Sequence, residues 1–425
     1  MKVLFIVGSC LYMNTSANMS HNAYIKGLIE NGYDVDVLMP DNSFGEKDNI
    51  LKNIEGANYY IFPYYSNLTL KIFSLKDKIR KGSSAKTVSQ VSSANDGLEV
   101  SKPGLKAKIK SIVKKIYNKL INNDDIYWQM YYWMNNTFKN YNLSDEYDLV
   151  ISNSSPAAGH KLAMMLRDSK KVKSDRWIQI WEDPWAYDLY GNAQTKIIEE
   201  EHSVLKSADE IVYVSPLTLL YQQKYYSDCA DKMRCVPLPF FEYELTDEKQ
   251  NVDTEISYGY FGDYYSKTRN LIPFYNAVKQ TDTKAYIYGD TDLSLESTDK
   301  IDISPRVTLD VLAQVQAKAE VLVHLCNLKG GQIPGKIYHY SATKKPILFI
   351  LDGTYEEKEC IKEFFEPYGR YIMCNNDKDS IINAIKEINS NPKEYEKIDA
   401  FCPKNIVNQI ISGKRACDIA IHTSL

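Results

Sequence analysis

The sequence predicts an α/β protein made of two doubly wound domains. Short apolar runs that read as strands alternate with helical stretches along most of the chain, a pattern typical of parallel sheets covered by helices. The alternation stops at a polar, acidic segment, 241–255, and then starts again. The chain has 425 residues, and this length favours two domains.

The first predicted domain covers residues 1–240. Apolar and β-branched runs predict its strands at 2–8, 34–39, 58–63, 148–152, 176–181, 210–214 and 233–237. A helix is expected over 19–31, because Gly32 follows it as a typical C-cap. Residues 75–145 interrupt this rhythm, and we interpret them as a flexible, basic insertion.

The second predicted domain covers residues 256–402 and repeats the pattern. Its strands are expected at 256–261, 285–288, 320–325, 346–351 and 371–374. Helices are expected at 269–280 and 378–389, and the tail, 403–425, predicts a last helix that packs back across the domains. Ligands of doubly wound folds bind at the carboxyl ends of the strands, so we expect the site in a cleft between the domains.

Composition and charge exclude several classes of function. A formal net charge of −4 gives no reason to expect a nucleic-acid partner. No run of about 18 apolar residues is present, so no transmembrane helix is expected. The stretch from Met1 to Gly8 reads as a buried strand rather than a signal peptide, which predicts a cytoplasmic protein.

No segment predicts a metal site. The eight cysteines are scattered without the Cys or His spacing of a metal centre, so reduced thiols are expected. Two Asp-x-Asp patterns, at 34–36 and 290–292, are too short to indicate a metal, and we interpret them as ordinary acidic residues. We therefore expect no metal and no other cofactor.

A Gly-rich segment ahead of the strand at 346–351 is the most informative motif. Gly330, Gly331 and Gly335 leave backbone N–H groups open to a close ligand. Lys336 follows in the first turn of a helix. A helix N-terminus beside a cation favours an anion, so this segment predicts a phosphate site.

A second turn of the same domain has a similar character. Gly262 follows the strand at 256–261, and Lys267 and Arg269 come at the start of the next helix. Taken alone, the segment could be an ordinary surface turn with two charges. Together with the Gly-rich segment, it favours a diphosphate that is held at the mouth of the sheet.

Polar residues end three predicted strands of the first domain. Ser9 follows the first strand, where the absence of Gly-x-Gly-x-x-Gly disfavours a dinucleotide site of the NAD type. Ser154 lies in a polar turn after the fourth strand. Glu182 and Asp183 end the next strand and could bind sugar hydroxyls or act as a base, while Trp185 offers a stacking face. The alternative left open is a turn in which Asp183 caps a helix before proline.

The insertion contains one amphipathic segment, 105–120. Its apolar face is formed by Leu105, Ile109, Ile112, Ile116 and Leu120. Lysines occupy much of the remainder, and a basic amphipathic helix suggests contact with an anionic membrane surface. The alternative is a solvated helix that packs on the first domain.

In the order and spacing of these segments, the chain resembles retaining GT-B glycosyltransferases of family 4, in their bacterial polysaccharide branch. The resemblance covers nearly the whole chain and is carried by the N-terminal strand and loop and by the segments 152–156, 177–185, 208–215, 260–262 and 334–340. It implies a GT-B fold with two Rossmann-like domains, a nucleotide-sugar donor held mainly by the C-terminal domain, and transfer with retention and without a metal.

The resemblance assigns the donor side to the second domain. Lys336, together with Lys267 or Arg269, would stabilise the leaving nucleoside diphosphate, which is a purely electrostatic role. The backbone would approach the donor closely at three glycines, Gly262, Gly331 and Gly335. The family pattern has a pair of glutamates, and here the two positions fall on Gly331 and His339. A histidine at the second position could still hydrogen-bond the ribose.

The resemblance assigns the acceptor side to the first domain. Asp183, with Glu182 beside it, would lie next to the acceptor or the reacting sugar, and Ser9, Ser154 and Trp185 would complete that side. The predicted protein is a glycosyltransferase at the cytoplasmic face of the membrane. Its acceptor would be a lipid-linked or surface glycan in capsule, O-antigen or exopolysaccharide assembly.

Two alternatives stay open at this point. A GT-B sugar-nucleotide epimerase would need groups that move protons, and Asp183 and His339 leave it possible. A non-catalytic GT-B binding or scaffold subunit is compatible with the missing glutamate pair.

Overall fold

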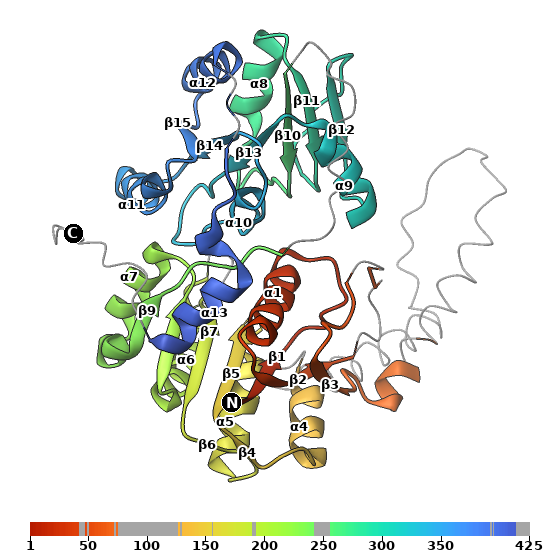
Figure 1. The fold of residues 1–425 in the computed structure, drawn as a ribbon, viewed down its shortest axis with the longest axis vertical. Coiled ribbons are helices and arrows are strands. Elements are labelled where there is room, and N and C mark those ends of the chain that lie inside the picture. The colour runs from red at the N-terminus through yellow and green to blue at the C-terminus, as the bar shows by residue number, and fades with distance from the viewer. Residues whose placement is uncertain are drawn as a thin grey trace, which may run out of the picture.

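Two Rossmann-like domains, one above the other in Figure 1, make up the computed structural model of the chain. The structure describes residues 1–41, 47–48, 51–71, 74, 126–127, 130–154, 156–188, 193–241, 256–391, 393 and 395–413. The amphipathic segment 105–120, the linker residues 242–255 and the tail from 414 onward lie outside the described residues.

The N-terminal domain is a seven-stranded parallel sheet in the order β3-β2-β1-β5-β7-β8-β9. Its strands are β1 (Lys2–Val7), β2 (Asp34–Pro40), β3 (Ala57–Phe62), β5 (Leu149–Ser154), β7 (Trp177–Trp181), β8 (Glu210–Tyr213) and β9 (Met233–Cys235). The helices are α1 (Ser16–Glu30), α4 (Tyr131–Asn140), α5 (Ala158–Asp168), α6 (Thr195–Ser207), α7 (Pro216–Tyr225) and the 3-10 helix η1 (Ser227–Lys232). A separate parallel pair joins β4 (Glu146–Tyr147) to β6 (Lys173–Ser174).

The C-terminal domain is a six-stranded parallel sheet in the order β12-β11-β10-β13-β14-β15. Its strands are β10 (Ser257–Phe261), β11 (Lys284–Tyr288), β12 (Ile301–Ser304), β13 (Val321–Leu325), β14 (Ile347–Leu351) and β15 (Tyr371–Asn375). The helices are α8 (Ile272–Gln280), α9 (Leu309–Lys318), α10 (Lys336–Ser341), α11 (Tyr355–Phe365), α12 (Lys378–Ser390) and the 3-10 helices η2 (Glu366–Tyr368) and η3 (Asp399–Phe401).

Each sheet has one point at which the strand order reverses. In the N-terminal sheet it lies between β1 and β5, and in the C-terminal sheet between β10 and β13. These central strands are apolar and buried, as expected for parallel strands covered by helices on both faces. Ligands of doubly wound sheets bind at the carboxyl ends beside this reversal, so each domain presents one such edge.

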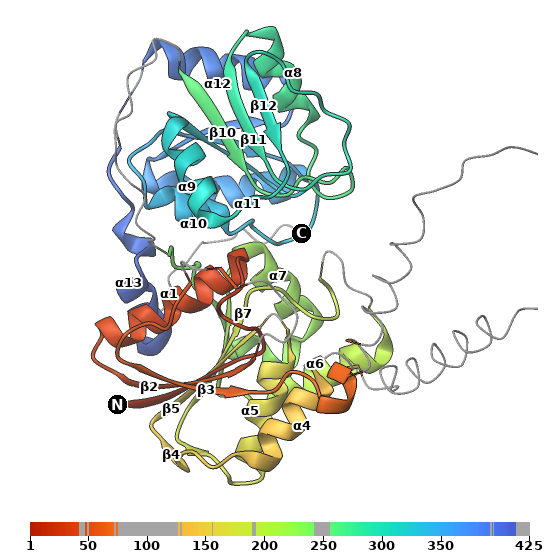
Figure 2. The same ribbon diagram turned by 90° about the vertical axis from the view of Figure 1, so that its right-hand side faces the viewer.

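The chain returns to the N-terminal domain at α13 (Pro403–Ser412). Figure 2 shows α13 beside α1, and a Cβ atom at Gly27 would lie 2.3 Å from the carbonyl oxygen of Pro403, so the approach requires glycine. Arg234 donates to the last carbonyl groups of α13, and Glu210 forms an ion pair with it. The last described helix therefore packs on the first sheet.

The predicted α/β class with two doubly wound sheets is confirmed. The sequence pattern misses β12, because this short edge strand has only one fully buried residue, Ile301. α10 ends at Ser341, before the turn that leads into Pro346, and is shorter than the segment suggested. Among the described helices, none is long and apolar enough to cross a membrane.

Candidate functional site

Loops at the carboxyl ends of the two sheets contact each other. The Ser215 hydroxyl, at the start of α7, donates to the carbonyl oxygen of Gly331. Phe241, the first residue of the segment that joins the domains, donates its backbone N–H to Nδ1 of His339 on α10, 3.1 Å away. These contacts bring the Gly-rich loop against the N-terminal domain, so the two predicted halves of the site lie at one junction.

Two glycines of this loop provide the close approach between the domains. A Cβ atom at Gly331 would lie 2.6 Å from the backbone nitrogen of Thr218, and one at Gly335 would lie 2.8 Å from Oγ of Ser16. The third glycine, Gly330, has a φ of 90° and donates its N–H to Glu357 at 2.8 Å. The N–H of Gly330 is therefore already used within the protein.

Gly331→Ala is expected to destabilise the folded protein by about 1–3 kcal/mol, because the new methyl group meets backbone atoms of α7 that cannot rotate away. Chemical denaturation measures the change. Gly262→Ala is the matched control, since the atoms nearest to its Cβ position lie at 3.8 Å or beyond. Equal stability of the two variants would contradict the tight contact at Gly331.

Lys336, the first residue of α10, carries an unpaired cation. Within the described part of the chain, no hydrogen bond or ion pair reaches its ammonium group. Burial, followed by the charge of Arg306, lowers the pKa of Lys336 to about 8, and Asp263 opposes the shift. A partly buried ammonium without a counter-ion is suited to an anionic ligand.

Arg269 lies beside Gly262, as the sequence suggests for one of its two alternative cations. Its Nη1 donates to the carbonyl oxygen of Asp263 at 2.8 Å, and its Nε donates to Oδ1 of Asn327 at 2.9 Å. Lys267 is exposed, and its charge contributes to the lowered pKa of Asp292, behind the hydrogen bonds from Ser266. The structure therefore brings Arg269, and not Lys267, to the edge of the sheet with Gly262.

Asp183 faces the Gly-rich loop from the N-terminal domain. Nε2 of Gln332 donates to Oδ1 of Asp183 and, at 2.5 Å, to Oδ1 of Asp188. Burial, followed by the charges of Asp188 and Glu182, raises the pKa of Asp183 to about 7, and the bond from Gln332 opposes the rise. A carboxyl group that exchanges its proton near neutral pH is suited to a hydroxyl-bearing ligand.

Glu182 points into a different, buried network. Its Oε1 lies 3.1 Å from Nε2 of His21, which is fully buried, and accepts from Nδ2 of Asn153 at 3.3 Å. Ser9 joins the network, because its Oγ lies 3.2 Å from Nδ1 of His21 and donates to Asn18 at 2.7 Å. Sequence reasoning missed His21, which the helical pattern hides among other buried residues of α1.

The turn that carries Trp185 is fixed by a buried carboxylate. Glu201 accepts from the backbone N–H groups of Trp185 and Ala186, each at 2.9 Å, and from the Tyr226 hydroxyl at 2.8 Å. The Trp185 ring packs against Tyr127 at a centroid distance of 4.8 Å, so one side of the ring is covered. Glu201 was not found from the sequence, since it reads as one of several glutamates on α6.

Ser154 lies next to this turn. Its hydroxyl is directed at the main-chain oxygen of Asp183, at 3.5 Å. The three polar strand ends that the sequence singles out thus reach one edge of the N-terminal sheet. At this edge, Ser9 and Glu182 belong to the buried network around His21. The Ser154 hydroxyl instead contacts Asp183, which faces Gln332 of the Gly-rich loop.

His339, on α10, presents a hydrogen-bond donor that has no acceptor among the described residues. Its Nδ1 accepts from Phe241, and burial, followed by the charge of Lys336, lowers its pKa to about 3. The ring is therefore neutral and carries its proton on Nε2, for which the described residues offer no acceptor.

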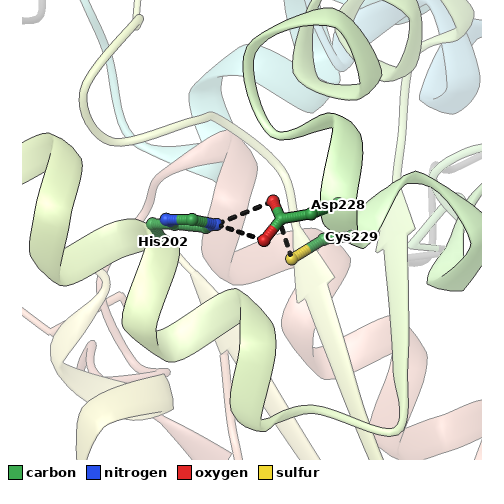
Figure 3. A group of neighbouring side chains, drawn as sticks. All are labelled: His202, Asp228 and Cys229. Carbon is green, nitrogen blue, oxygen red and sulfur yellow. Dashed lines mark hydrogen bonds and ion pairs between the residues drawn. The ribbon is translucent and has the colours of Figure 1, made fainter.

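A group of metal-compatible side chains lies on α6 and η1. Figure 3 shows His202, Asp228 and Cys229, with the two carboxylate oxygens of Asp228 at 2.8 and 3.1 Å from Nε2 of His202. Lys206 lies 2.9 Å from the same carboxylate, and the bonds from Lys206 and His202 lower the pKa of Asp228 to about 2. An ion-pair cluster accounts for this arrangement, and metal independence of the protein stays a prediction.

Comparison with known proteins gives matches in structure only. A scan against protein-family models finds no match, and a search of curated proteins finds none. The catalytic domain of starch synthase IV from Arabidopsis thaliana, bound to ADP and acarbose, matches 98% of this chain with 96% of its own, at 8% identity and a TM-score of 0.57. An E. coli trehalose-6-phosphate structure bound with UDP-2-fluoro glucose matches 97% of this chain with 96% of its own, at 10% identity and a TM-score of 0.53.

A third structure of the same kind is an alpha-glucosyltransferase in complex with UDP and a 13-mer DNA, which covers 97% of this chain with 100% of its own. Its identity is 11% and its TM-score is 0.52. At such identities the likeness shows the fold alone. The chain has the GT-B fold of glycosyltransferases, which confirms the predicted architecture. Membership of family 4 and of its polysaccharide branch stays a prediction.

Proposed function

We propose that the protein is a glycosyltransferase that moves a sugar from a nucleotide-sugar donor to a lipid-linked or surface glycan, with retention at the anomeric carbon. The observation that carries this proposal is the unpaired ammonium of Lys336 at the edge where the two domains meet. A partly buried cation without a counter-ion favours an anionic ligand, and a nucleoside diphosphate is such an anion. The nucleotides in the similar structures, UDP-2-fluoro glucose, ADP and UDP, support this choice of ligand.

On the donor side, Lys336 and Arg269 would stabilise the leaving group. Negative charge grows on the diphosphate as its bond to the sugar breaks, and fixed cations in a partly desolvated site stabilise that charge without reorganising. The Nε2–H group of His339, which has no acceptor among the described residues, would donate to the ribose. The proposed reaction uses these side chains and no metal.

On the acceptor side, Asp183 would hold the attacking hydroxyl. Its pKa of about 7 leaves the carboxylate able to accept a hydrogen bond near neutral pH. Gln332, on the Gly-rich loop, connects this carboxylate to the donor side. Ser154 and Trp185 would shape the surface on which the acceptor lies.

We further propose that the protein works at the cytoplasmic face of a membrane in capsule, O-antigen or exopolysaccharide assembly. The support is the basic sequence of 105–120 and two exposed apolar side chains, Leu68 at 61% and Tyr131 at 40% exposure, which precede and follow that segment in the chain. Attraction to anionic lipid contributes about 1 kcal/mol per lysine near the surface.

Replacing Lys108, Lys110, Lys114 and Lys115 by glutamine is expected to reduce cosedimentation with anionic phospholipid vesicles by about tenfold or more. Vesicles of neutral phospholipid are the control, and neither protein should bind them strongly. Unchanged binding of the variant to anionic vesicles would contradict a membrane role for this segment.

A transfer assay tests the proposed activity. The purified protein is incubated with UDP-, GDP-, CDP-, TDP- and ADP-sugars, with and without a lipid-linked glycan extract, and the released nucleotide and the anomeric configuration of the product are measured. The proposal expects nucleoside diphosphate only when the acceptor is present, and a product with the donor's configuration. Release without acceptor would favour an epimerase, and no release or binding would favour a scaffold subunit.

A further inference from the structure

Arg306 is a cation of the site that the sequence did not single out. It follows the edge strand β12, and its guanidinium reaches over the carboxyl ends of the two neighbouring strands. It forms an ion pair with Asp263, in the loop after β10, and its Nε lies 4.0 Å from Asp290, in the loop after β11. Its Nη1 is directed at the carbonyl oxygen of Asn14, 3.4 Å away in the N-terminal domain. One side chain therefore contacts three loops on both sides of the junction.

The guanidinium has donors to spare. Its side chain is 50% exposed, and only the contact with Asp263 is short, so the pair is not a buried structural ion pair. A guanidinium carries five N–H donors in a planar fork that fits a phosphate. Because its exposed side is open to the solvent, Arg306 can bind a second anion without leaving the site.

Two other cations belong to the same edge of the C-terminal sheet as Arg306. Arg306 is the nearby charge that most lowers the pKa of Lys336, which places the two cations close together. Arg269 adds a third cation, through its bond to the backbone of Asp263. Lys336 has no counter-ion of its own among the described residues, so an anion bound beside Arg306 would also lie near Lys336.

Asp263 is held independently of Arg306. Its Oδ1 accepts from the backbone N–H of Asp290 at 3.0 Å, and its carbonyl oxygen accepts from the Tyr260 hydroxyl at 3.2 Å. If the guanidinium moves toward a phosphate, Asp263 keeps these bonds. The ion pair can therefore exchange one anion for another without rebuilding the loop.

We propose that Arg306 is a positioning residue that binds a phosphate group of the nucleoside diphosphate and keeps its contact with the Asn14 loop, so that donor binding is coupled to the contact between the domains. Asp263 is the counter-ion that the phosphate replaces. The inference rests on the proposed function and extends it to a residue outside the two predicted phosphate turns.

The test combines binding with steady-state kinetics. The nucleoside diphosphate that binds the wild-type protein is titrated by calorimetry into Arg306→Ala, Arg306→Lys and Asp263→Asn, and KM and kcat are measured with the matching nucleotide-sugar. Arg306→Ala is expected to weaken binding by about 10- to 100-fold, as for the loss of a charge-assisted hydrogen bond. Arg306→Lys is expected to bind within about fivefold of wild type, yet to lose at least about tenfold in kcat, because one ammonium cannot serve a phosphate and Asn14 together.

Asp263→Asn is expected to change the affinity for the diphosphate in the opposite direction. Removing the competing counter-ion is expected to strengthen diphosphate binding by about three- to tenfold. The exposed Lys386, on α12, provides a charge control, and Lys386→Ala should bind like wild type. Thermal unfolding of each variant without nucleotide should stay within a few degrees of wild type, which separates the effect from misfolding.

Three results would overturn the inference. Wild-type affinity in Arg306→Ala, with binding lost in Lys336→Ala, would remove Arg306 from the donor site and leave the proposed function intact. Full kcat in Arg306→Lys would remove the coupling between the domains. If the wild-type protein binds none of the UDP, GDP, CDP, TDP and ADP panel, both the inference and the proposed function fail.

Discussion

Replacing Lys336 by alanine is expected to lower kcat/KM for the nucleotide-sugar by about 10²–10³-fold, as for the loss of one preorganised group that stabilises developing charge. The reason is that Lys336 has no counter-ion among the described residues and lies near the charge of Arg306. Steady-state kinetics with the active nucleotide-sugar measure the effect. Lys267→Ala is the informative comparison, because Lys267 is exposed and should lose less than about threefold.

The role of Lys336 also predicts how nucleotide binding depends on pH. The pKa of Lys336 is about 8, and a bound diphosphate would raise it, so the complex holds more protons than the free protein above this pH. Affinity is therefore expected to fall as the pH rises through about 8 and to level off as the pH is lowered toward 7. A flat profile up to pH 10, or a larger effect of Lys267→Ala than of Lys336→Ala, would contradict the assignment.

Asp183→Asn is expected to cost about 10²–10⁴-fold in kcat and to stabilise the fold at alkaline pH. The pKa of Asp183 is about 7 in the folded protein and near 4 in an unfolded chain, so the folded state binds the extra proton between these values. Stability from this group therefore falls as the pH rises from 4 to 7. Asparagine removes that loss and can still accept the bond from Gln332.

Denaturation at pH 5 and pH 8 checks the stability effect of Asp183→Asn. The free energy of unfolding of the variant should exceed that of the wild type by about 1–3 kcal/mol at pH 8 and by less at pH 5. This range allows for the partial exposure of Asp183. Glu201→Gln is a useful contrast, since Glu201 accepts three hydrogen bonds and its loss should destabilise. A variant that is inactive and also less stable at pH 8 would show that Asp183 serves the fold rather than the site.

The sequence predicts the fold class well because buried parallel strands leave continuous apolar runs. The stretch from Val3 to Val7 is fully buried, and its pattern alone identifies a central strand. β12 has no such apolar run, because it lies at the edge of its sheet and buries only one residue, Ile301. Missing that strand also meant missing Arg306, whose position depends on where β12 ends.

The candidate site could be predicted only in part. Glycine and lysine in the Gly-rich loop and the carboxylates after β7 carry local signals, and the structure brings Lys336 and Asp183 to one junction. Local spacing could not separate Lys267 from Arg269, because the choice depends on which side chain faces Gly262 in three dimensions. His21 was hidden for a similar reason, since its partner Glu182 is distant in sequence.

The most direct test of the account is a calorimetric titration of UDP, GDP, CDP, TDP and ADP into the wild-type protein and into Lys336→Ala. We expect one nucleotide to bind the wild-type protein clearly, and its affinity to fall by about tenfold or more in the variant, as for the loss of a charged partner. Such a result would identify the base of the donor and assign its diphosphate to the junction of the two domains. Binding that is unaffected by Lys336→Ala, or no binding of any of the five, would contradict the central claim.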